Sequence, residues 1–217
     1  MKTTIVIPLY NGKEWIADAV ESALSQTVRC EVIVVNDGST DGGEQVLKDY
    51  PVKLVHQVNK GLSSARNTGI MNATTEYILF LDADDMLLEN CVEELEKIAD
   101  TTKADSVAPS FREFGLGNAN VILMPAPTFQ DFQKGNRVGY CQLFRRSTLC
   151  ELGGYSPRMV HGYEDYHLSF NLLKRGKIIV TTPEVLWLYR IRENSMIHTA
   201  NQHREELMKQ IEKDFYD

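Results

Sequence analysis

The sequence predicts an α/β protein in which a mainly parallel central sheet is flanked by helices. Over the first hundred residues, short apolar runs alternate with stretches whose apolar residues recur at helical spacing. The apolar runs are rich in β-branched residues and lack alternating polarity, which is typical of strands covered on both faces. Ligands of such sheets gather beyond the carboxyl ends of the strands. The polar residues that follow the apolar runs are therefore the candidate site residues.

Length and composition are those of one globular domain. The chain has 217 residues, of which 43% are hydrophobic and 24% are charged, and this is enough for a single domain with a large core. The net charge of −7 argues against a nucleic-acid-binding protein, because no surplus of Lys and Arg is present to bind a phosphate backbone. We therefore expect no nucleic-acid partner.

The cysteines and the hydropathy pattern favour a cytoplasmic protein. The four cysteines lack the close spacing of zinc sites and of disulfide frameworks, so we expect reduced thiols; they are Cys30, Cys91, Cys141 and Cys150. The chain starts with a strand rather than a signal peptide, and no apolar run approaches the roughly 20 residues that span a bilayer. Peripheral attachment to the inner face of the membrane stays open, as does a homodimer.

Four strands and four helices are expected in the first half of the chain. The strands are apolar runs bounded by polar or turn residues, at 5–9, 32–35, 52–56 and 77–81. The helices follow them, marked by helical spacing and caps, at 15–24, 45–49, 63–71 and from about 89 to 99. Trp15 belongs to the apolar stripe of the first helix, and Ser63 or Ser64 is the expected cap of the third.

The second half of the chain is less regular. Residues 110–140 contain several Gly and Pro and show no sustained period, so we expect loops with one short strand at 121–124. Substrate specificity commonly lies in such segments. Helices are expected from about 147 to Gly153-Gly154, from 165 to 174 and from about 202. Strands are expected at 178–180 and 186–189.

Three carboxylates follow the fourth strand, in Asp82-Ala83-Asp84-Asp85. Carboxylates crowded at a strand end repel one another and each prefers to stay in water. A divalent cation removes that repulsion, and hard oxygen ligands suit Mg²⁺ or Mn²⁺ with substrate phosphates completing the shell. The alternative is a solvated acidic turn that caps the following helix.

Two other strand ends carry side chains suited to a ligand. Tyr10 follows the first strand and can lay its ring on a flat base, a contact worth about 0.5–1.5 kcal/mol beyond burial. The alternative for Tyr10 is a packing aromatic. Asp37 follows the second strand and can accept a hydrogen bond from the imide N–H of uracil or thymine. The alternative for Asp37 is turn stabilisation, since Asp-Gly-Ser is common in turns.

Five short motifs, in this order along the chain, together resemble family 2 of the glycosyltransferases, which are inverting enzymes with the GT-A fold. They are IVIPLYN at 5–11, VVNDGSTD at 34–41, NKGLSSARNTG at 59–69, LDADD at 81–85 and GYED at 162–165. The resemblance extends from Thr4 to about His198. It implies a single GT-A domain over 1–217, with a nucleotide-binding half at 1–109, an acceptor-binding half at 110–200 and a C-terminal helix at 201–217.

The resemblance implies roles for the residues of the first four motifs. Nucleotide contacts are expected from Pro8, Tyr10, Asn11, Asp37, Lys60, Arg66 and Asp82. Asp84 is expected to bind Mg²⁺ or Mn²⁺ between the two phosphates, with Asp82 facing the ribose, and Asp85 is expected to cap the next segment. Arg66 cannot bury its charge unpaired, so the alternative for it is a structural bridge to an Asp without ligand contact.

The last motif is expected to supply a general base. Inversion requires a group that takes the proton of the acceptor hydroxyl as it attacks opposite the leaving group. The resemblance assigns this role to Asp165, and an acceptor contact or loop-orienting role to Glu164. Without the resemblance, an acidic pair at a helix N-terminus is ordinary helix-dipole chemistry. His198 occupies a region where some GT-A enzymes place a metal-binding histidine, although a lone His is commonly a surface residue.

These assignments predict metal-dependent transfer of a single sugar from a UDP- or dTDP-sugar to a hydroxyl of a glycan or lipid-linked acceptor, in surface polysaccharide biosynthesis. The QxxRW motif of processive family members is missing, since residues 189–193 are YRIRE, although Arg190 and Arg192 can reach phosphates. One alternative is a non-catalytic nucleotide-sugar-binding protein, which the presence of Asp84 and Asp165 disfavours. Another is a sugar-1-phosphate nucleotidyltransferase, which needs a Gly-rich basic loop after the first strand.

Overall fold

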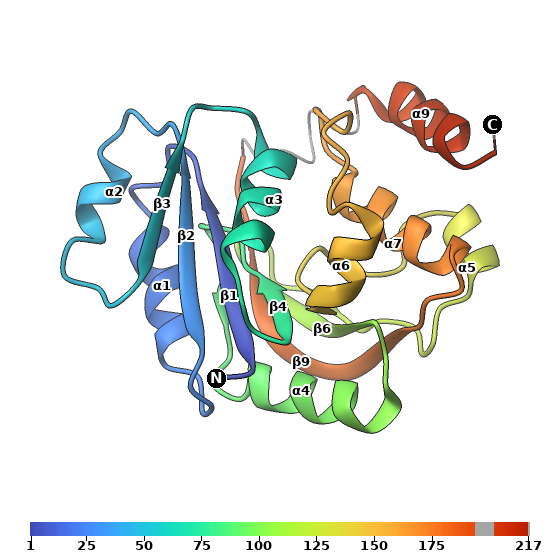
Figure 1. Cartoon of the computed structure of the whole chain (residues 1–217), viewed down its shortest axis with the longest axis horizontal. Helices are drawn as coiled ribbons and strands as arrows, with labels where there is room; N and C mark the ends of the chain where they lie inside the picture. The colour runs from blue at the N-terminus through green and yellow to red at the C-terminus, as the bar shows by residue number, and fades with distance from the viewer. Residues whose placement is uncertain (194–201, 217) are drawn as a thin grey trace.

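A mixed sheet forms the centre of the molecule (Figure 1). The computed structural model describes residues 1–193 and 202–216, and the sheet has nine strands within them. In chain order the strands are β1 (Thr3–Leu9), β2 (Glu31–Asp37), β3 (Lys53–Gln57), β4 (Tyr77–Phe80), β5 (Met86–Leu87), β6 (Ser106–Gly115), β7 (Asn120–Val121), β8 (Leu143–Arg145) and β9 (Ile179–Ile191). Their order across the sheet is β3-β2-β1-β4-β8-β6-β9-β5, with β7 paired to β6.

Helices cover both faces of the sheet, as the sequence predicts. They are α1 (Ile16–Leu24), α2 (Gly43–Val46), α3 (Leu62–Asn72), α4 (Cys91–Thr102), α5 (Phe129–Gln133), α6 (Arg146–Leu152), α7 (Glu164–Lys174) and α9 (Arg204–Tyr216). Buried residues of α1 and α4 form one core cluster with the sheet, and those of α3, α6 and α7 form the other. Figure 1 shows α1 and α3 on opposite sides of β1.

The parallel half of the sheet is confirmed. β3, β2, β1 and β4 run parallel, with Val6 opposite Ile33 on one side and Phe80 on the other. Every residue of β1 is buried, and Ile5 and Ile7 belong to one core cluster while Val6 belongs to the other. Because both faces of β1 are covered, its sequence has no alternating polarity.

Two glycines set how α3 lies on this half of the sheet. A Cβ on Gly69 would stand 2.2 Å from Cγ1 of Val6, so the helix packs against β1 at a distance that only glycine permits. Gly61 precedes α3 with φ +85°, a conformation that side chains disfavour. The prediction that Ser63 or Ser64 caps this helix is wrong, because the turn at Gly61 starts the helix earlier and buries Ser63.

The second half of the sheet differs from the expected loops. β6 runs through Ser106–Gly115 and pairs in parallel with β9, so part of 110–140 is strand rather than loop. The two strands expected at 178–180 and 186–189 are one strand, β9, in which a register shift takes up Pro183. Proline has no backbone N–H to donate, and a bulge accommodates it because the ladder needs no hydrogen-bond donor at the bulged position. β8 lies antiparallel to β4 and β6, which makes the sheet mixed rather than mainly parallel throughout.

Two further differences lie between β6 and β8. The strand expected at 121–124 is shortened to β7 (Asn120–Val121). A short helix, α5, is present where loops were expected. Its capping box is complete, because Thr128 Oγ1 accepts from the backbone N–H of Asp131 and Asp131 accepts from the N–H of Thr128.

The C-terminal helix α9 docks on α7. Leu207 and Ile211 are 4% and 2% exposed and join the core cluster of α7. Asp214 binds Arg158 at 2.8 Å and His167 at 3.1 Å. None of the helices in the described ranges combines the length and apolar composition needed to cross a bilayer.

Candidate active site

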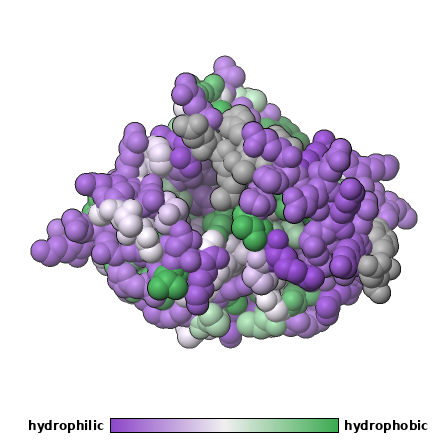
Figure 2. Space-filling model, turned by 90° about the horizontal axis from the view of Figure 1, so that it is seen from above, coloured by the Kyte–Doolittle hydropathy of each residue, from purple (hydrophilic) through white to green (hydrophobic). Residues whose placement is uncertain are grey.

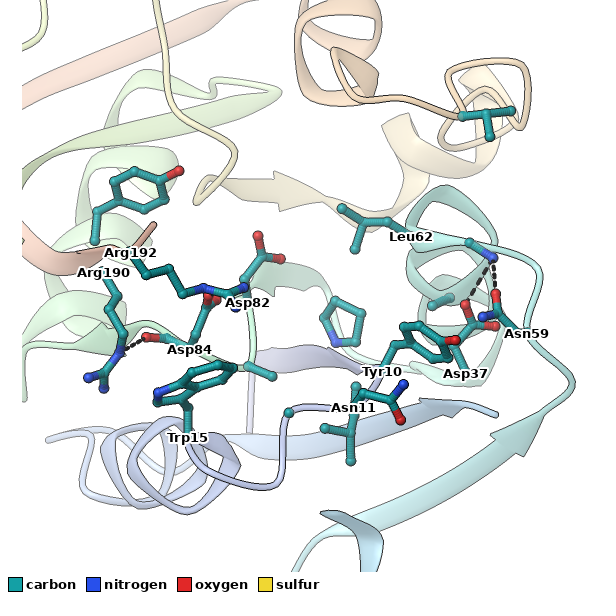
Figure 3. A pocket seen from close by; sticks show the side chains of 18 residues that line it. Tyr10, Asn11, Trp15, Asp37, Asn59, Leu62, Asp82, Asp84, Arg190 and Arg192 are labelled. Carbon is teal, nitrogen blue, oxygen red and sulfur yellow. Dashed lines mark hydrogen bonds and ion pairs between the residues drawn. The ribbon is translucent and has the colours of Figure 1, made fainter. Parts of the chain in front are cut away.

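A cavity of about 540 Å³ lies at the carboxyl ends of β1, β2 and β4 (Figure 3). We call it the first cavity. Its walls include the predicted residues Pro8, Tyr10, Asn11, Asp37, Asp82 and Asp84, together with Trp15, Tyr189, Arg190 and Arg192. The described wall does not include Lys60 or Arg66. Figure 2 views this end of the sheet, where the surface is largely hydrophilic and hollowed near its centre. A volume of this size suits a small-molecule ligand.

The loop after β1 presents Tyr10 to the first cavity. The side chain of Tyr10 is 54% exposed, which excludes the packing alternative, because a core aromatic would be covered. Asn11 ties this loop to the one after β2: its Oδ1 accepts from the N–H of Thr40 at 2.9 Å, and its own N–H donates to Ser39 Oγ at 3.1 Å. Two loops from neighbouring strand ends are thereby joined beside the exposed ring.

Asp37 organises the loop between β3 and α3. Its Oδ1 accepts from Gln57 Nε2 at 2.7 Å and from the N–H of Lys60 at 2.8 Å, and its Oδ2 accepts from the N–H of Gly61 at 2.9 Å. Asp37 is 3% exposed and lines the first cavity. The carboxylate therefore holds a distant loop, whereas a local turn was the expected alternative, and Oδ2 keeps capacity for one more donor.

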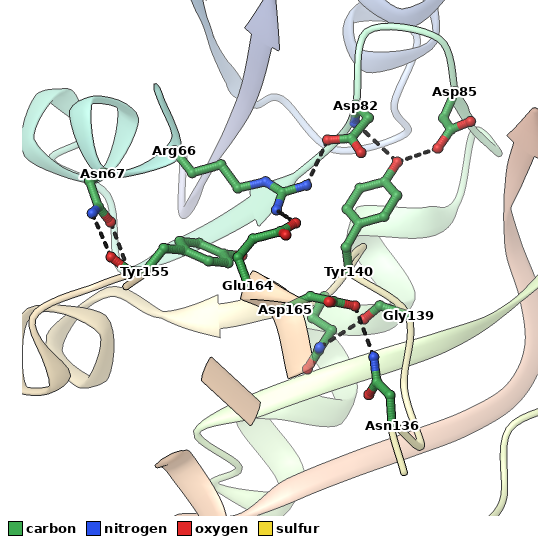
Figure 4. Close-up of polar contacts among 11 residues, drawn as sticks. Arg66, Asn67, Asp82, Asp85, Asn136, Gly139, Tyr140, Tyr155, Glu164 and Asp165 are labelled. Atoms are coloured by element: carbon green, nitrogen blue, oxygen red, sulfur yellow. Dashed lines mark hydrogen bonds and ion pairs between the residues drawn. The ribbon is translucent and has the colours of Figure 1, made fainter. Parts of the chain in front are cut away.

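Arg66 is fully buried between two carboxylates (Figure 4). Its guanidinium donates to Asp82 at 2.8 Å and to Glu164 at 2.6 Å, and it lies 5.1 Å from the ring centres of Tyr140 and Tyr155. Burial disfavours the charged form, yet the neighbouring carboxylates, Asp82 first, raise the pKa of Arg66 well above its ordinary value. Arg66 thus joins the end of β4 to the start of α7, and its contact with a nucleotide stays a prediction.

Asp85 does not cap the next helix, so that prediction is wrong. Its side chain is 1% exposed and accepts from the hydroxyl of Tyr140 and from the N–H of Arg190. Burial and the neighbouring aspartates raise the pKa of Asp85 well above its ordinary value. The physical reason is β5, which pairs with β9 directly after Asp85 and turns this side chain into the interior. α4 begins only at Cys91.

Asp82 and Asp84 are the acidic residues of the motif that face the first cavity. Asp84 pairs with Arg192 at 2.7 Å. Burial, followed by the charge of Asp82, raises the pKa of Asp84, and Arg192 opposes this effect. Repulsion between the two carboxylates is therefore present in the fold.

The donor set fits Mg²⁺ or Mn²⁺ that is shared with a ligand. Among the described residues, no group of three or more His, Cys, Asp or Glu is arranged to hold a metal ion. Mg²⁺ usually takes one or two carboxylates and completes its shell with waters and substrate phosphates, which is what Asp82 and Asp84 allow. His198, predicted as a further ligand, lies outside the described residues.

A second cavity of about 480 Å³ adjoins the first, and Asp82 and Tyr189 line both. We call it the second cavity. Its other walls come from the loop after α5, the start of α7 and the C-terminal helix α9, which contributes Arg204 and Met208. Both residues predicted from the GYED motif, Glu164 and Asp165, lie in it.

Asp165 has the electrostatics of a base that works near neutral pH. Its Oδ2 accepts from Asn136 Nδ2 at 2.9 Å (Figure 4). Burial and the adjacent charge of Glu164 raise the pKa of Asp165 to about 7. Glu164 is 6% exposed, and its ion pair with Arg66 compensates its charge. The two acidic neighbours thus differ in environment, which is how proteins give paired carboxylates different roles.

Sequence reasoning missed several residues of the site. Trp15 was placed in the apolar stripe of the first helix, but it precedes α1, lines the first cavity and lies 4.4 Å from the guanidinium of Arg192. Tyr140 accepts from the N–H of Asp82 at 3.0 Å and donates to Asp85. An aromatic residue directly after the first motif is a usable signal for Trp15. For Tyr140 the chain offers none, because 58 residues separate it from Asp82.

Parallel strands that end in a carboxylate-lined cavity, and a second cavity that shares a wall with it, define a protein of the GT-A glycosyltransferase fold. Two solved structures support this class. Residues 1–349 of S. aureus TarS, solved in complex with UDP-GlcNAc, match with a TM-score of 0.82 and 19% identity, covering 97% of this chain and 65% of that one. The mannosyltransferase PcManGT of Pyrobaculum calidifontis, in complex with GDP-Man and Mn²⁺, matches with a TM-score of 0.77 and 20% identity, covering 100% and 64%.

The chain belongs to glycosyl transferase family 2, whose family model matches residues 4–153. It is 27% identical over 213 residues to the glycosyltransferase EpsJ of Bacillus subtilis, covering 89% of this chain and 62% of EpsJ. It is 42% identical over 104 residues to the glycosyltransferase YibD of Escherichia coli, covering 45% of this chain and 30% of YibD. The chain therefore spans less than two thirds of the length of these relatives.

Proposed function

We propose that this protein transfers a single sugar, with inversion, from a UDP- or dTDP-sugar to a hydroxyl group of a glycan or lipid-linked acceptor. One observation carries the proposal: a cavity lined by Asp82 and Asp84 adjoins a cavity that holds Asp165, whose pKa is raised to about 7. The first suits a nucleoside diphosphate with a cation, and the second suits an acceptor and a base. Family membership supports the same reaction class.

The nucleotide is expected in the first cavity, between the loops after β1 and β2. Tyr10 offers an exposed ring on which a base can stack. Asp37 Oδ2 can accept from the imide N–H of uracil or thymine, because within residues 1–193 and 202–216 this oxygen has one donor, Gly61. Pro8 and Asn11 shape the same wall, and Lys60 is held beside it through its backbone N–H. These contacts suit a flat base that carries an N–H, as uracil and thymine do.

Asp84 would hold Mg²⁺ or Mn²⁺, and Asp82 would lie toward the ribose. When bound, the cation supplies positive charge that stabilises the departing diphosphate. Arg66 keeps Asp82 in place from below, because it donates to Asp82 without reaching the cavity wall. The cation would then lie between the carboxylate of Asp84 and the diphosphate and would offset the negative charge of both.

Asp165 would act as the general base. An oxygen lone pair of the acceptor hydroxyl forms a bond to the anomeric carbon, the bond from that carbon to the diphosphate oxygen breaks on the opposite side, and Asp165 takes the hydroxyl proton. Asn136 orients the carboxylate through its hydrogen bond. Glu164, fixed by Arg66, is placed to contact the acceptor and to orient Asp165.

We further propose a role in surface polysaccharide biosynthesis, at the inner face of the membrane. This role follows from the resemblance to family 2, and the support for it is membership of that family. The division into a nucleotide-binding half at 1–109 and an acceptor-binding half at 110–200 is part of this proposal. The first cavity draws most of its walls from the first of these halves, and the second cavity draws most of its walls from residues beyond 109.

A screen of nucleotide sugars for release of UDP or dTDP, with Mn²⁺ and with EDTA, tests the proposed reaction. Release that needs both the cation and an acceptor is the expected result. Asp165→Asn is the matched control, because it keeps the size of the side chain but removes the base. Tight nucleotide-sugar binding without release, in the presence of a broad acceptor panel, would instead indicate a non-catalytic binding protein.

A further inference from the structure

We propose that Arg192 holds the carboxylate of Asp84 before the donor binds, and that it moves to the diphosphate of the donor when a divalent cation takes its place on Asp84. The inference rests on the proposed function, since it concerns the diphosphate and the cation of the first cavity. Arg192 would then bind the diphosphate together with the cation. The cation would bind Asp84 first, and Arg192 would move to the diphosphate afterwards.

The ion pair between Arg192 and Asp84 lies inside the first cavity (Figure 3). Nη2 of Arg192 is 2.7 Å from Oδ2 of Asp84, and the two side chains are 36% and 19% exposed. The guanidinium also lies over the ring of Trp15 at 4.4 Å, a cation–π contact. The guanidinium of Arg192 thus pairs with the carboxylate of Asp84, which we propose as the metal ligand.

The remaining donors of Arg192 are not used up by this arrangement. Its Nε is buried and has no hydrogen-bond partner among the described residues. A buried donor without a partner is costly, and arginine presents Nε and Nη together in a fork that matches phosphate oxygens. The unsatisfied donor, the fork and the position in the cavity wall point to an anionic ligand with several oxygens.

The neighbouring Arg190 shows what a purely structural arginine looks like at this place. Its Nε donates to the backbone oxygen of Asp84 at 2.7 Å, its Nη2 pairs with Asp18 at 3.1 Å, and its guanidinium lies 4.4 Å from the ring centre of Phe114. The guanidinium of Arg190 therefore fixes the end of β9 without pairing with an acidic side chain of the motif; only its backbone N–H donates to one, Asp85. Arg192 differs because its charged partner is Asp84.

The exchange follows from the charges. The carboxylate of Asp84 has further lone pairs for a metal ion, but a divalent cation bound to it would stand next to the guanidinium that donates to Oδ2 at 2.7 Å, and the two positive charges repel each other. Binding of the cation therefore displaces Arg192, and the diphosphate that arrives with the cation is the nearest new anion. Trp15 gives the freed guanidinium a surface over which it can swing. Arg192 thus compensates the negative charge of Asp84 in the absence of the donor, and it compensates the charge of the diphosphate when the donor binds.

Two binding measurements on Arg192→Met test the exchange. The substitution keeps the stem that packs on Trp15 and removes the charge. In the first, free Mn²⁺ is followed by electron paramagnetic resonance without nucleotide, with Asp84→Asn defining any binding elsewhere. Arg192→Met should bind Mn²⁺ about tenfold more tightly than the unmodified chain, because the competing cation is gone. Equal Mn²⁺ affinity in the two proteins, including no binding by either, would overturn the exchange.

In the second measurement, UDP is titrated in the presence of saturating Mn²⁺. Arg192→Met should bind UDP about tenfold or more weakly, because the diphosphate loses a charge-assisted contact. The opposite signs of the two effects separate the exchange from a merely structural role, which would weaken both affinities. Arg29→Met is the matched control, since Arg29 is exposed and precedes β2 at the other end of the sheet; both of its affinities should stay unchanged.

Failure of the proposed function and failure of the exchange are distinguishable. If the unmodified chain binds none of UDP, dTDP and GDP in the presence of Mn²⁺, the proposed function falls and this inference falls with it. If the unmodified chain binds UDP and Arg192→Met binds it equally well, the inference alone is overturned. Thermal unfolding of each variant confirms that the compared proteins are folded.

Discussion

The two cavities of this protein are built in different ways. The first cavity is made mainly by the segments that follow β1, β3 and β4, together with Asp37 at the end of β2, so most of its residues lie close to strand ends in the sequence. The second cavity is made by the loop after α5, the start of α7 and one face of α9, which meet only through tertiary packing. Parallel strands bring their carboxyl ends to one edge whatever their loops contain. If the proposed function is right, the residues that bind the donor are tied to the sheet, whereas those that bind the acceptor can change with the covering segments.

The sharpest separation of the two cavities is expected from Asp165→Asn. Transfer should fall by about 10²–10⁴, the usual range for loss of a positioned base. Nucleotide affinity in the presence of Mn²⁺ should stay unchanged, because Asp165 lies in the second cavity. Steady-state transfer assays and calorimetry with UDP measure the two quantities. Near-normal turnover in Asp165→Asn would show that Asp165 is not the base but only an acidic residue in the first turn of α7.

The link between the cavities can be broken with Arg66→Met. Two carboxylates, Asp82 and Glu164, would then lose their buried cation, which costs about 3 kcal/mol of unfolding free energy. Denaturant unfolding measures this loss. Adding Asp82→Asn and Glu164→Gln to the same chain should recover part of it, because no uncompensated charge then remains. If the triple variant is as unstable as Arg66→Met, loss of packing rather than of charge explains the effect.

On the nucleotide side, Asp37→Ala should weaken UDP binding by about 1.5–3 kcal/mol, the value of a hydrogen bond to a charged acceptor. Asp37 also holds the loop that contains Lys60 and Gly61. Gln57→Met is therefore the control, since it removes one of the bonds that Asp37 accepts but no contact with a base. Calorimetry should find a smaller loss for Gln57→Met. Equal losses in the two variants would assign Asp37 to the loop alone.

On the acceptor side, pH should act through Asp165. Its pKa is raised to about 7 by burial and by Glu164, and a base works only when deprotonated. Transfer should therefore fall about tenfold for each pH unit below 7 and level off above it. The rate of transfer at saturating donor, measured from pH 5 to pH 9, checks this. A profile that is flat across pH 7 would contradict the assignment of the base.

The smallest effect is expected from Thr128→Ala. It removes the cap of α5, which costs about 1 kcal/mol of stability. The loop after α5 carries Asn136, the partner of Asp165, so transfer should weaken while UDP affinity does not change. Thermal unfolding and calorimetry measure these effects. A matching loss of UDP affinity would mean that the two cavities are not independent.

The difference between the two cavities also explains which features can be predicted from the sequence. The strands of the parallel half and the positions of Tyr10, Asp37 and Asp82 in the wall of the first cavity are predictable, because buried strands and the residues that follow them are local patterns. The capping box of α5 is also local, with Asp131 three residues after Thr128, and is sufficient to predict that helix.

Other features depend on partners that are distant in the chain. β6 is hard to predict because its apolar residues show no clear period, and the strand that stabilises it, β9, pairs Ile179 with Ser106. Asp85 follows the acidic motif, but its burial is decided by Tyr140 and by the pairing of β5 with β9. Composition and periodicity contain no information on such contacts. The walls of the second cavity are mostly of this kind.

The arginine held between Asp82 and Glu164 has a consequence for how sequences of this type can diverge. A mutation at any one of the three positions leaves an unpaired charge in the interior, and selection removes it. A change is tolerated only when a second mutation compensates it. The three positions should therefore evolve jointly, as one inherited unit, while Met71 and Leu116, both more than half exposed, drift independently.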